Sequence, residues 1–159
     1  MQTDDPLRTQ LAKLLDWGEA HADFDKAVAD LPAEMRGRRP DRFPHSVWEL
    51  VEHIRLAQHE ILEFCHTSDY EELRWPEGYW PTMQAPPHDN AWERSLEGFR
   101  HDRQEFQSFV SDPALDLTAR IPHGTGQTYL RELLLAADHT SYHVGQIIAV
   151  RRLLGAWPA

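Results

Sequence analysis

The sequence predicts an all-α fold in which four helices pack as a bundle. Four segments repeat apolar residues at spacings of three and four, the period of one buried helix face. Proline-containing breaks separate them, and no segment alternates strictly as a half-buried strand does. Helices of roughly 20 residues, about 30 Å long, suit a four-helix bundle. The expected helices cover about residues 6–31, 46–66, 91–111 and 129–154.

The first expected helix runs over residues 6–31 as one continuous element. Gly18 on its stripe would let a neighbouring helix approach closely, because glycine has no side chain. Pro32 and the arginine-rich residues 36–39 then end the pattern. The stripe consists of Leu7, Leu11, Leu14, Gly18, His21 and Val28.

The second expected helix, residues 46–66, has the best-defined start. Ser46 precedes Glu49 by three residues, which is the pattern of a capping box. His53 falls on the same stripe as Leu50 and Phe64, so we expect it to face the bundle interior. The apolar face consists of Val47, Leu50, Val51, Ile54, Ile61, Leu62 and Phe64.

The third expected helix, residues 91–111, begins with a weaker form of this cap. Asn90 would cap it, with Glu93 three residues further on. Arg103 interrupts an otherwise apolar stripe. That stripe consists of Trp92, Leu96, Phe99, Phe106 and Val110.

The fourth expected helix, residues 129–154, carries signals at both ends. Thr128 is the expected N-cap, and Gly155 follows the last turn. Arg151 and Arg152 suit the negative C-terminal end of a helix. Its broad apolar surface consists of Leu130, Leu133, Leu134, Ala137, Ile147, Ile148 and Leu154.

The connection over residues 67–89 is unusually long for a compact domain, which indicates a functional loop or a crossover. It would carry the chain back along the bundle, so that the second and third helices run parallel. It contains four prolines and the aromatic residues Trp75, Tyr79 and Trp80. We expect these aromatics to border the mouth of a pocket, although plugging the end of the bundle is the competing interpretation.

Composition narrows the range of functions. A chain of 159 residues suits a single domain, residues 1–159. The formal net charge of −10 argues against nucleic acid and against an anionic membrane surface. The lone Cys65 cannot form an intrachain disulfide, the acidic residues 1–5 lack an apolar signal region, and no apolar run would span a bilayer. These features favour a cytoplasmic protein.

Three histidines form the strongest candidate site. His139 and His143 are one turn apart on the fourth helix, close enough for both imidazoles to reach one ion. His53 on the buried stripe of the second helix is the best third ligand. The structural alternative is three separate, partly buried histidines bonded to neighbouring hydroxyls and carbonyls. Three imidazoles inside an apolar bundle would be costly without a shared partner, which favours the metal site.

Four further residues are weaker candidates. Glu60, on the stripe of His53, is either a general base or acceptor near the metal, or a carboxylate reaching water. Gln146 is either an amide that orients a ligand imidazole or a helix-packing residue. Arg103 more readily pairs with a carboxylate than contacts substrate, and His21 is a reserve ligand. The histidines expected to be solvated are His45, His66, His88, His101 and His123; His59 also lies off the stripe.

The chain resembles the DinB-like superfamily, also called the YfiT-like metal-dependent hydrolases. The resemblance rests on residues 49–54 (ELVEHI), residues 139–147 (HTSYHVGQI) and residues 151–155 (RRLLG). It extends over nearly the whole chain in helix order and spacing. The second motif is fairly specific, whereas the first is weak alone.

The resemblance implies an up-down-down-up bundle with one divalent metal, often nickel or zinc, on His53, His139 and His143. It also implies a homodimer. Relatives include thiol-dependent transferases and a maleylpyruvate isomerase that use mycothiol or bacillithiol, so a low-molecular-weight thiol is a possible cosubstrate.

The expected function is a metal-dependent enzyme that activates water or a thiol for hydrolysis or S-transfer on a small molecule. The alternative is a non-catalytic, metal- or small-molecule-binding stress-response bundle. Metal affinity should weaken below about pH 6, because imidazoles bind metals only when neutral.

Overall fold

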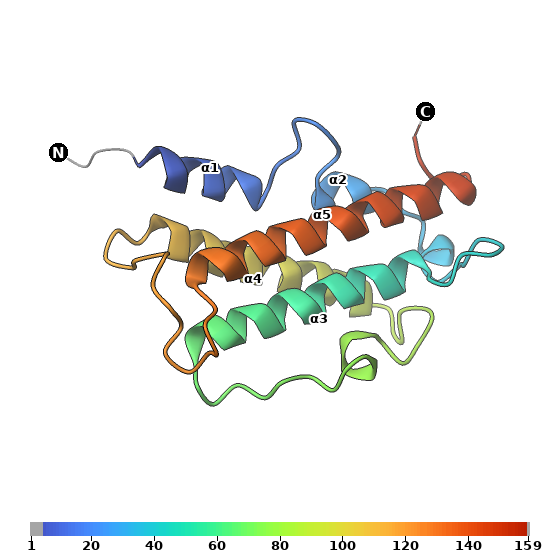
Figure 1. The fold of residues 1–159 in the computed structure, drawn as a ribbon. Coiled ribbons are helices and arrows are strands. Elements are labelled where there is room, and N and C mark those ends of the chain that lie inside the picture. The colour runs from blue at the N-terminus through green and yellow to red at the C-terminus, as the bar shows by residue number, and fades with distance from the viewer. Residues whose placement is uncertain (1–4, 159) are drawn as a thin grey trace.

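The computed structural model describes residues 5–158, and the regular secondary structure of this range is helical apart from one isolated bridge between Arg120 and Thr128 (Figure 1). The expected lack of a signal region rests on residues 1–5, of which residues 1–4 lie outside the described range. No helix of the described range is long and apolar enough to cross a membrane. The α-helices are α1 Pro6–Leu14, α2 Phe24–Val28, α3 Val47–His66, α4 Ala91–Ser111 and α5 Tyr129–Leu153; the 3₁₀ turns are η1 Ala33–Met35 and η2 Glu77–Tyr79.

The boundaries of α3, α4 and α5 confirm the sequence-based ones to within a residue. The capping box at the start of α3 is complete: the Glu49 N–H donates to Ser46 Oγ at 3.2 Å, and the Ser46 N–H donates to the Glu49 carboxylate at 2.8 Å. Thr128 caps α5 by accepting from the Arg131 N–H. The expected cap at Asn90 is wrong. Its backbone, at φ −96° and ψ 3°, is not extended as an N-cap requires, and its side chain makes no capping bond.

The expected single helix over residues 6–31 is also wrong, because it is broken between α1 and α2. Gly18 lies in the break, where glycine weakens a helix by about 1 kcal/mol relative to alanine. Asp23 then starts a new helix by accepting from the Lys26 N–H at 2.7 Å. The nearest side chain to Gly18 is that of Asp23 rather than a neighbouring helix, so the expected close approach of helices there does not occur.

The helices form a bundle in which α3 packs against both α4 and α5. The two pieces of the broken first helix have different neighbours, since α1 packs on α4 and α2 packs on α5. In Figure 1 the chain runs in one direction along α3 and α4 and in the other along α1 and α5. The long segment after α3 runs back beside that helix through η2 before α4 begins, which is the crossover that the length of the segment predicted.

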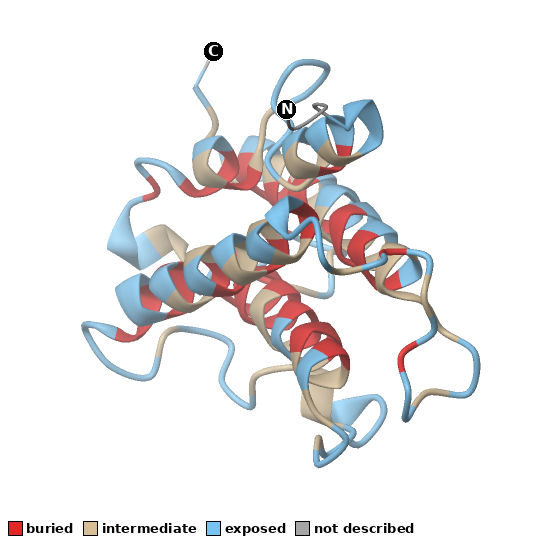
Figure 2. Cartoon of the chain, turned by 90° about the vertical axis from the view of Figure 1, so that its left-hand side faces the viewer, coloured by how far each residue is buried: buried red, intermediate tan, exposed pale blue. Residues whose placement is uncertain are grey.

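The core consists of two apolar clusters arranged along the bundle, and the buried helix faces point inward in Figure 2. One cluster joins α2 to the first half of α3 and the last half of α5, through residues such as Val28, Ile54 and Ile147. The other joins α1 to the opposite ends of α3 and α5, through Leu11 and Leu133 among others. The break in the first helix lets its two pieces serve different clusters.

Arg151 fixes α2 to the end of α5. Its side chain is 1% exposed and donates to three backbone carbonyls, those of Ala27, Ala29 and Ala156, at 2.7–2.9 Å. The guanidinium also lies over the Trp157 ring, 5.1 Å from its centroid. Carbonyls left free at the end of the short helix α2 are thereby satisfied.

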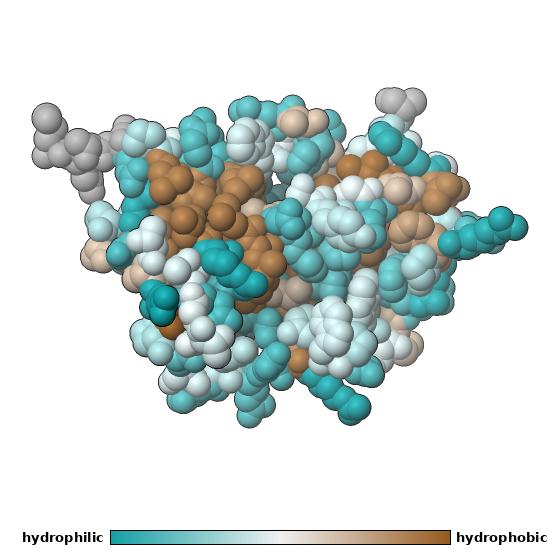
Figure 3. Space-filling view, viewed as in Figure 1, coloured by the Kyte–Doolittle hydropathy of each residue, from teal (hydrophilic) through white to brown (hydrophobic). Residues whose placement is uncertain are grey.

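One side of the molecule carries an exposed apolar patch. Figure 3 shows apolar residues gathered over α1 and the first half of α5. Among the exposed large apolar side chains of these two helices, Leu7 on α1 is 52% exposed and Leu134 on α5 is 44% exposed. A patch of this kind on a folded chain is typical of a contact surface.

Candidate metal centre

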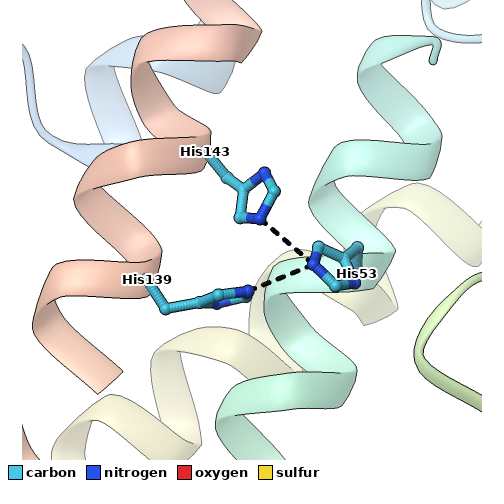
Figure 4. A group of neighbouring side chains, drawn as sticks. All are labelled: His53, His139 and His143. Atoms are coloured by element: carbon cyan, nitrogen blue, oxygen red, sulfur yellow. Dashed lines mark hydrogen bonds between the residues drawn. The ribbon is translucent and has the colours of Figure 1, made fainter. Parts of the chain in front are cut away.

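The three expected histidines come together between α3 and α5 (Figure 4). His53 lies on α3, and its Nε2 is 3.1 Å from the Nε2 atoms of both His139 and His143 on α5. His53 and His143 are buried, and His139 is half-buried. The i, i+4 spacing on α5 and the inward stripe of α3 therefore place three ring nitrogens around one point.

In His53 and His143, a hydrogen bond at Nδ1 determines that Nε2 is the nitrogen with a free lone pair. His53 Nδ1 lies 2.7 Å from the backbone carbonyl oxygen of Tyr79, and His143 Nδ1 lies 2.7 Å from Gln146 Oε1. Both partners are oxygens that only accept, so each Nδ1 carries the proton and donates. Each Nε2 is left with a lone pair directed at the shared point, as in histidines that bind metals.

The imidazoles are neutral at ordinary pH. Burial, followed by the other two histidines, lowers the pKa of His139 from 6.5 to about 3. Burial also lowers the pKa of His143 to about 4, and it lowers the pKa of His53. Neutral rings are the form that binds metal ions, so no proton has to be displaced near pH 7.

The donor set fits a borderline-soft divalent ion. Two nitrogens bonded to one ion at about 2.0–2.1 Å lie about 2.8–3.4 Å apart for bond angles between about 90° and 110°. The two separations that involve His53, both 3.1 Å, fall in this range, and the ligand atoms of the three residues all lie within 4.8 Å of one another. Three imidazole nitrogens without a carboxylate are typical of zinc, nickel or copper rather than magnesium or calcium.

The crossover segment covers the site with an aromatic ring. Trp80 stacks face to face between His45 and His53, with ring centroids 4.0 Å apart on each side and interplanar angles of 13° and 2°. His45 is therefore half-buried, and its expected solvation is wrong. Trp80 and Tyr79 contact His53 as expected of residues at the mouth of the site, whereas Trp75 is 74% exposed and contacts Tyr79.

Gln146 lies where the metal-site interpretation expects it. It accepts from His143 Nδ1, and its own amide group donates to the Tyr142 hydroxyl at 3.2 Å. The side chain is thus held at both ends, which fixes the ring orientation of His143.

Glu60 does not belong to the three-histidine group. It lies two turns further along α3, half-buried, in a cavity lined by none of the three histidines. A role as general base would therefore require a substrate that extends from the histidines into this cavity.

Arg103 and His21 serve other contacts. Arg103 forms ion pairs with Asp16 and Asp25, each at 2.9 Å, as the carboxylate-pairing interpretation predicted. His21 is exposed in the break between α1 and α2, where its Nε2 accepts from Ser141 Oγ at 3.3 Å. His66, His88, His101 and His123 are exposed, as expected, and so is His59.

Comparison with known proteins places this architecture in a family. The sequence model of the DinB superfamily matches residues 16–147, which is most of the chain. The chain belongs to the DinB superfamily. No curated protein and no solved structure matches it. Membership of the DinB superfamily, together with the three-histidine cluster, is compatible with a metal-binding protein.

Proposed function

We propose that this DinB-superfamily protein is a metal-dependent enzyme in which His53, His139 and His143 hold one divalent ion, nickel or zinc. The observation that carries the proposal is the convergence of three Nε2 atoms, two of them on rings whose Nδ1–H groups are tied back to Tyr79 and Gln146. The rings anchored in this way have fixed orientations, with each Nε2 free to bind an ion.

The reaction that fits this site is hydrolysis, or transfer to a low-molecular-weight thiol, on a small molecule in the cytoplasm. A divalent ion held by three protein ligands keeps positions open and lowers the pKa of a water or thiol near it, which supplies a nucleophile near neutral pH. Gln146 fixes the orientation of the His143 ring, and the Trp80 ring keeps water from one face of the His53 ring. The chain thus provides orientation and a partly dry site.

The decisive experiment measures metal stoichiometry and turnover on the same samples. Purified protein should hold one nickel or zinc ion per chain by elemental analysis, and His139→Ala and His143→Ala should hold none while keeping their helical circular dichroism. His101→Ala, which removes a histidine from an exposed position on α4, is the matched control and should keep its ion. Unchanged metal content in both α5 variants would remove the site assignment.

Turnover is then screened with activated esters, amides and pairs of a thiol with an electrophile. Turnover that is lost in His53→Ala supports an enzyme. Tight binding of a small molecule without turnover by any of these substrates would instead support the non-catalytic, stress-response alternative.

The proposal includes a homodimer. The apolar patch over α1 and α5 supports self-association, because a second copy would remove it from water. Leu7 and Leu134 are exposed apolar side chains of the same two helices. Sedimentation at micromolar concentration should show a dimer, and Leu134→Glu should shift it towards monomer. A monomer in the unmodified protein would remove this part of the proposal alone.

A further inference from the structure

A cavity of about 320 Å³ lies between α3, α5 and the crossover segment, further along the two helices that carry the three histidines. Glu60 on its α3 wall lies seven residues after His53, and Leu135 on its α5 wall lies four residues before His139. Residues at these spacings share a helix face, so the cavity lies on the same faces of α3 and α5 as the histidines, displaced along the bundle axis. Glu60 lies roughly 10 Å from His53 along the helix axis, from the helical rise over seven residues.

Tyr79 connects the cavity to the histidines. Its backbone carbonyl accepts from His53 Nδ1, and its side chain lines the cavity. A molecule in the cavity therefore lies against a residue that also positions a candidate metal ligand. This arrangement is what a substrate needs if one end binds in the cavity and the other end reaches the histidines.

The walls of the cavity are both acidic and aromatic. Three carboxylates, those of Glu60, Glu72 and Glu132, face one cation, Arg131, which is already bonded to Glu132 at 2.7 Å. Glu60 forms no ion pair with any described residue, although its carboxylate accepts a hydrogen bond from the Tyr79 hydroxyl. Burial raises the pKa of Glu60, the Tyr79 hydroxyl lowers it, and Glu72 and Glu132 raise it further, with a net upward shift. Bound positive charge would relieve this accumulation of negative charge.

The aromatic rings supply a second contribution that also favours a cation. Phe64 and Tyr70 meet edge to face, with centroids 5.2 Å apart, and both line the cavity together with Tyr79. The face of an aromatic ring attracts ammonium and guanidinium groups by about 0.5–2 kcal/mol. Carboxylates would attract any cation, whereas the rings add a preference for an organic cation over a small hydrated ion.

We propose that this cavity binds the ammonium or guanidinium group of a small organic cation, which presents its reacting group to His53, His139 and His143. The assignment of this cation as the substrate rests on the proposed function, whereas its binding in the cavity does not. The substrate class is therefore cationic, with a charged group roughly 10 Å from the bond that reacts.

Three probes of similar size test the charge preference: phenethylamine, phenethyl alcohol and phenylacetate. At neutral pH the amine should bind about tenfold more tightly than the alcohol, and phenylacetate should bind most weakly, as measured by titration calorimetry on the full chain. Glu60→Gln keeps the shape of the side chain and should remove most of this preference. Glu63→Gln, on the same helix but outside the cavity lining, is the matched control and should keep it.

Equal affinity for the three probes would overturn the proposal, and so would a preference that Glu60→Gln leaves unchanged. The titrations are repeated on chelator-treated protein and on His139→Ala to separate this inference from the proposed function. If these metal-free samples still prefer the amine, the cavity proposal is supported even where the proposed metal site is shown to be wrong. If the protein binds its metal ion but shows no preference for the amine, the cavity proposal is overturned and the metal-site proposal stands.

Discussion

The Nδ1–H of His143 donates to Gln146 Oε1 at 2.7 Å, one turn further along α5. The acceptor is supplied by the same helix as the ring it orients, so the orientation of His143 does not depend on how the other helices pack. His53 differs, because its acceptor is the carbonyl of Tyr79 in the crossover segment. One candidate ligand is thus fixed locally, and the other depends on how the loop folds.

Replacing Gln146 by leucine should weaken metal binding about 10- to 100-fold, because His143 loses the acceptor that fixes its tautomer. Gln146→Glu keeps an acceptor and should retain most of the affinity. Competitive titration against a chromogenic chelator measures the change, with Gln104→Leu on the exposed face of α4 as the control. Unaltered affinity in Gln146→Leu would mean that the amide only packs against its helix.

Trp80→Ala should weaken metal binding and speed the release of the ion, because His53 loses its stacking partner and gains access to water. Trp75→Ala, which removes a ring that is 74% exposed, should change neither property. Stopped-flow release into a chelator distinguishes the two variants. Equal release rates in the two variants would show that Trp80 only fills space over the bundle.

Metal affinity should be nearly constant between about pH 5 and 8 and should fall only as the pH approaches about 4. Protons compete with the ion at pH values near the folded pKa, which is about 3 for His139 and about 4 for His143. This revises the loss below about pH 6 that ordinary imidazoles predict, because burial disfavours the charged rings. Titration calorimetry across this range tests it; a tenfold loss by pH 6 would contradict the buried site.

The stability of the metal-free fold should decrease as the pH falls from 6.5 towards 4. Over this interval His143 is neutral in the folded chain but binds a proton when unfolded, so the unfolded state takes up more protons and gains stability. Each such histidine contributes a slope of at most about 1.4 kcal/mol per pH unit. Urea unfolding at several pH values should show a shallower dependence of stability on pH in His143→Ala than in the unmodified chain.

Arg151→Met should lower the free energy of unfolding by about 2–4 kcal/mol, because three buried carbonyls lose their donor. Arg151→Lys should recover only part of this loss, since an ammonium cannot reproduce the planar arrangement of donors. Arg152→Met at the neighbouring exposed position is the control in thermal unfolding. Metal stoichiometry should persist in the folded fraction of all three variants.

The helices that pack along their whole length could be predicted from sequence. Ser46, Glu49 and Thr128 mark helix starts through local hydrogen bonds, and local bonds are readable from spacing. The broken first helix could not be predicted, because its period continues through Gly18 while its two pieces pack against different helices. Gly18 and the Asp23 cap are weak local signals of the break, and tertiary packing, which the sequence does not show, decided it.

The candidate site was predictable where it depends on helix faces. His139 and His143 are one turn apart, and His53 lies on a buried stripe, so helical periodicity alone predicts that all three face the bundle interior. The position of Trp80 between His45 and His53 depends on the path of the crossover. The carbonyl of Tyr79 that holds His53 carries no side-chain signal at all, since every residue has one.

His53 and His139 are 86 residues apart in the chain and belong to helices that α4 separates in sequence. Their contact therefore closes a very long loop, and its entropic cost has to be met by the packing of α3 on α5. No contiguous fragment that lacks either helix contains all three histidines. An ion that needs all three histidines would link α3 to α5 only after both helices have packed. Retention of the ion would therefore report that α5 has docked on α3.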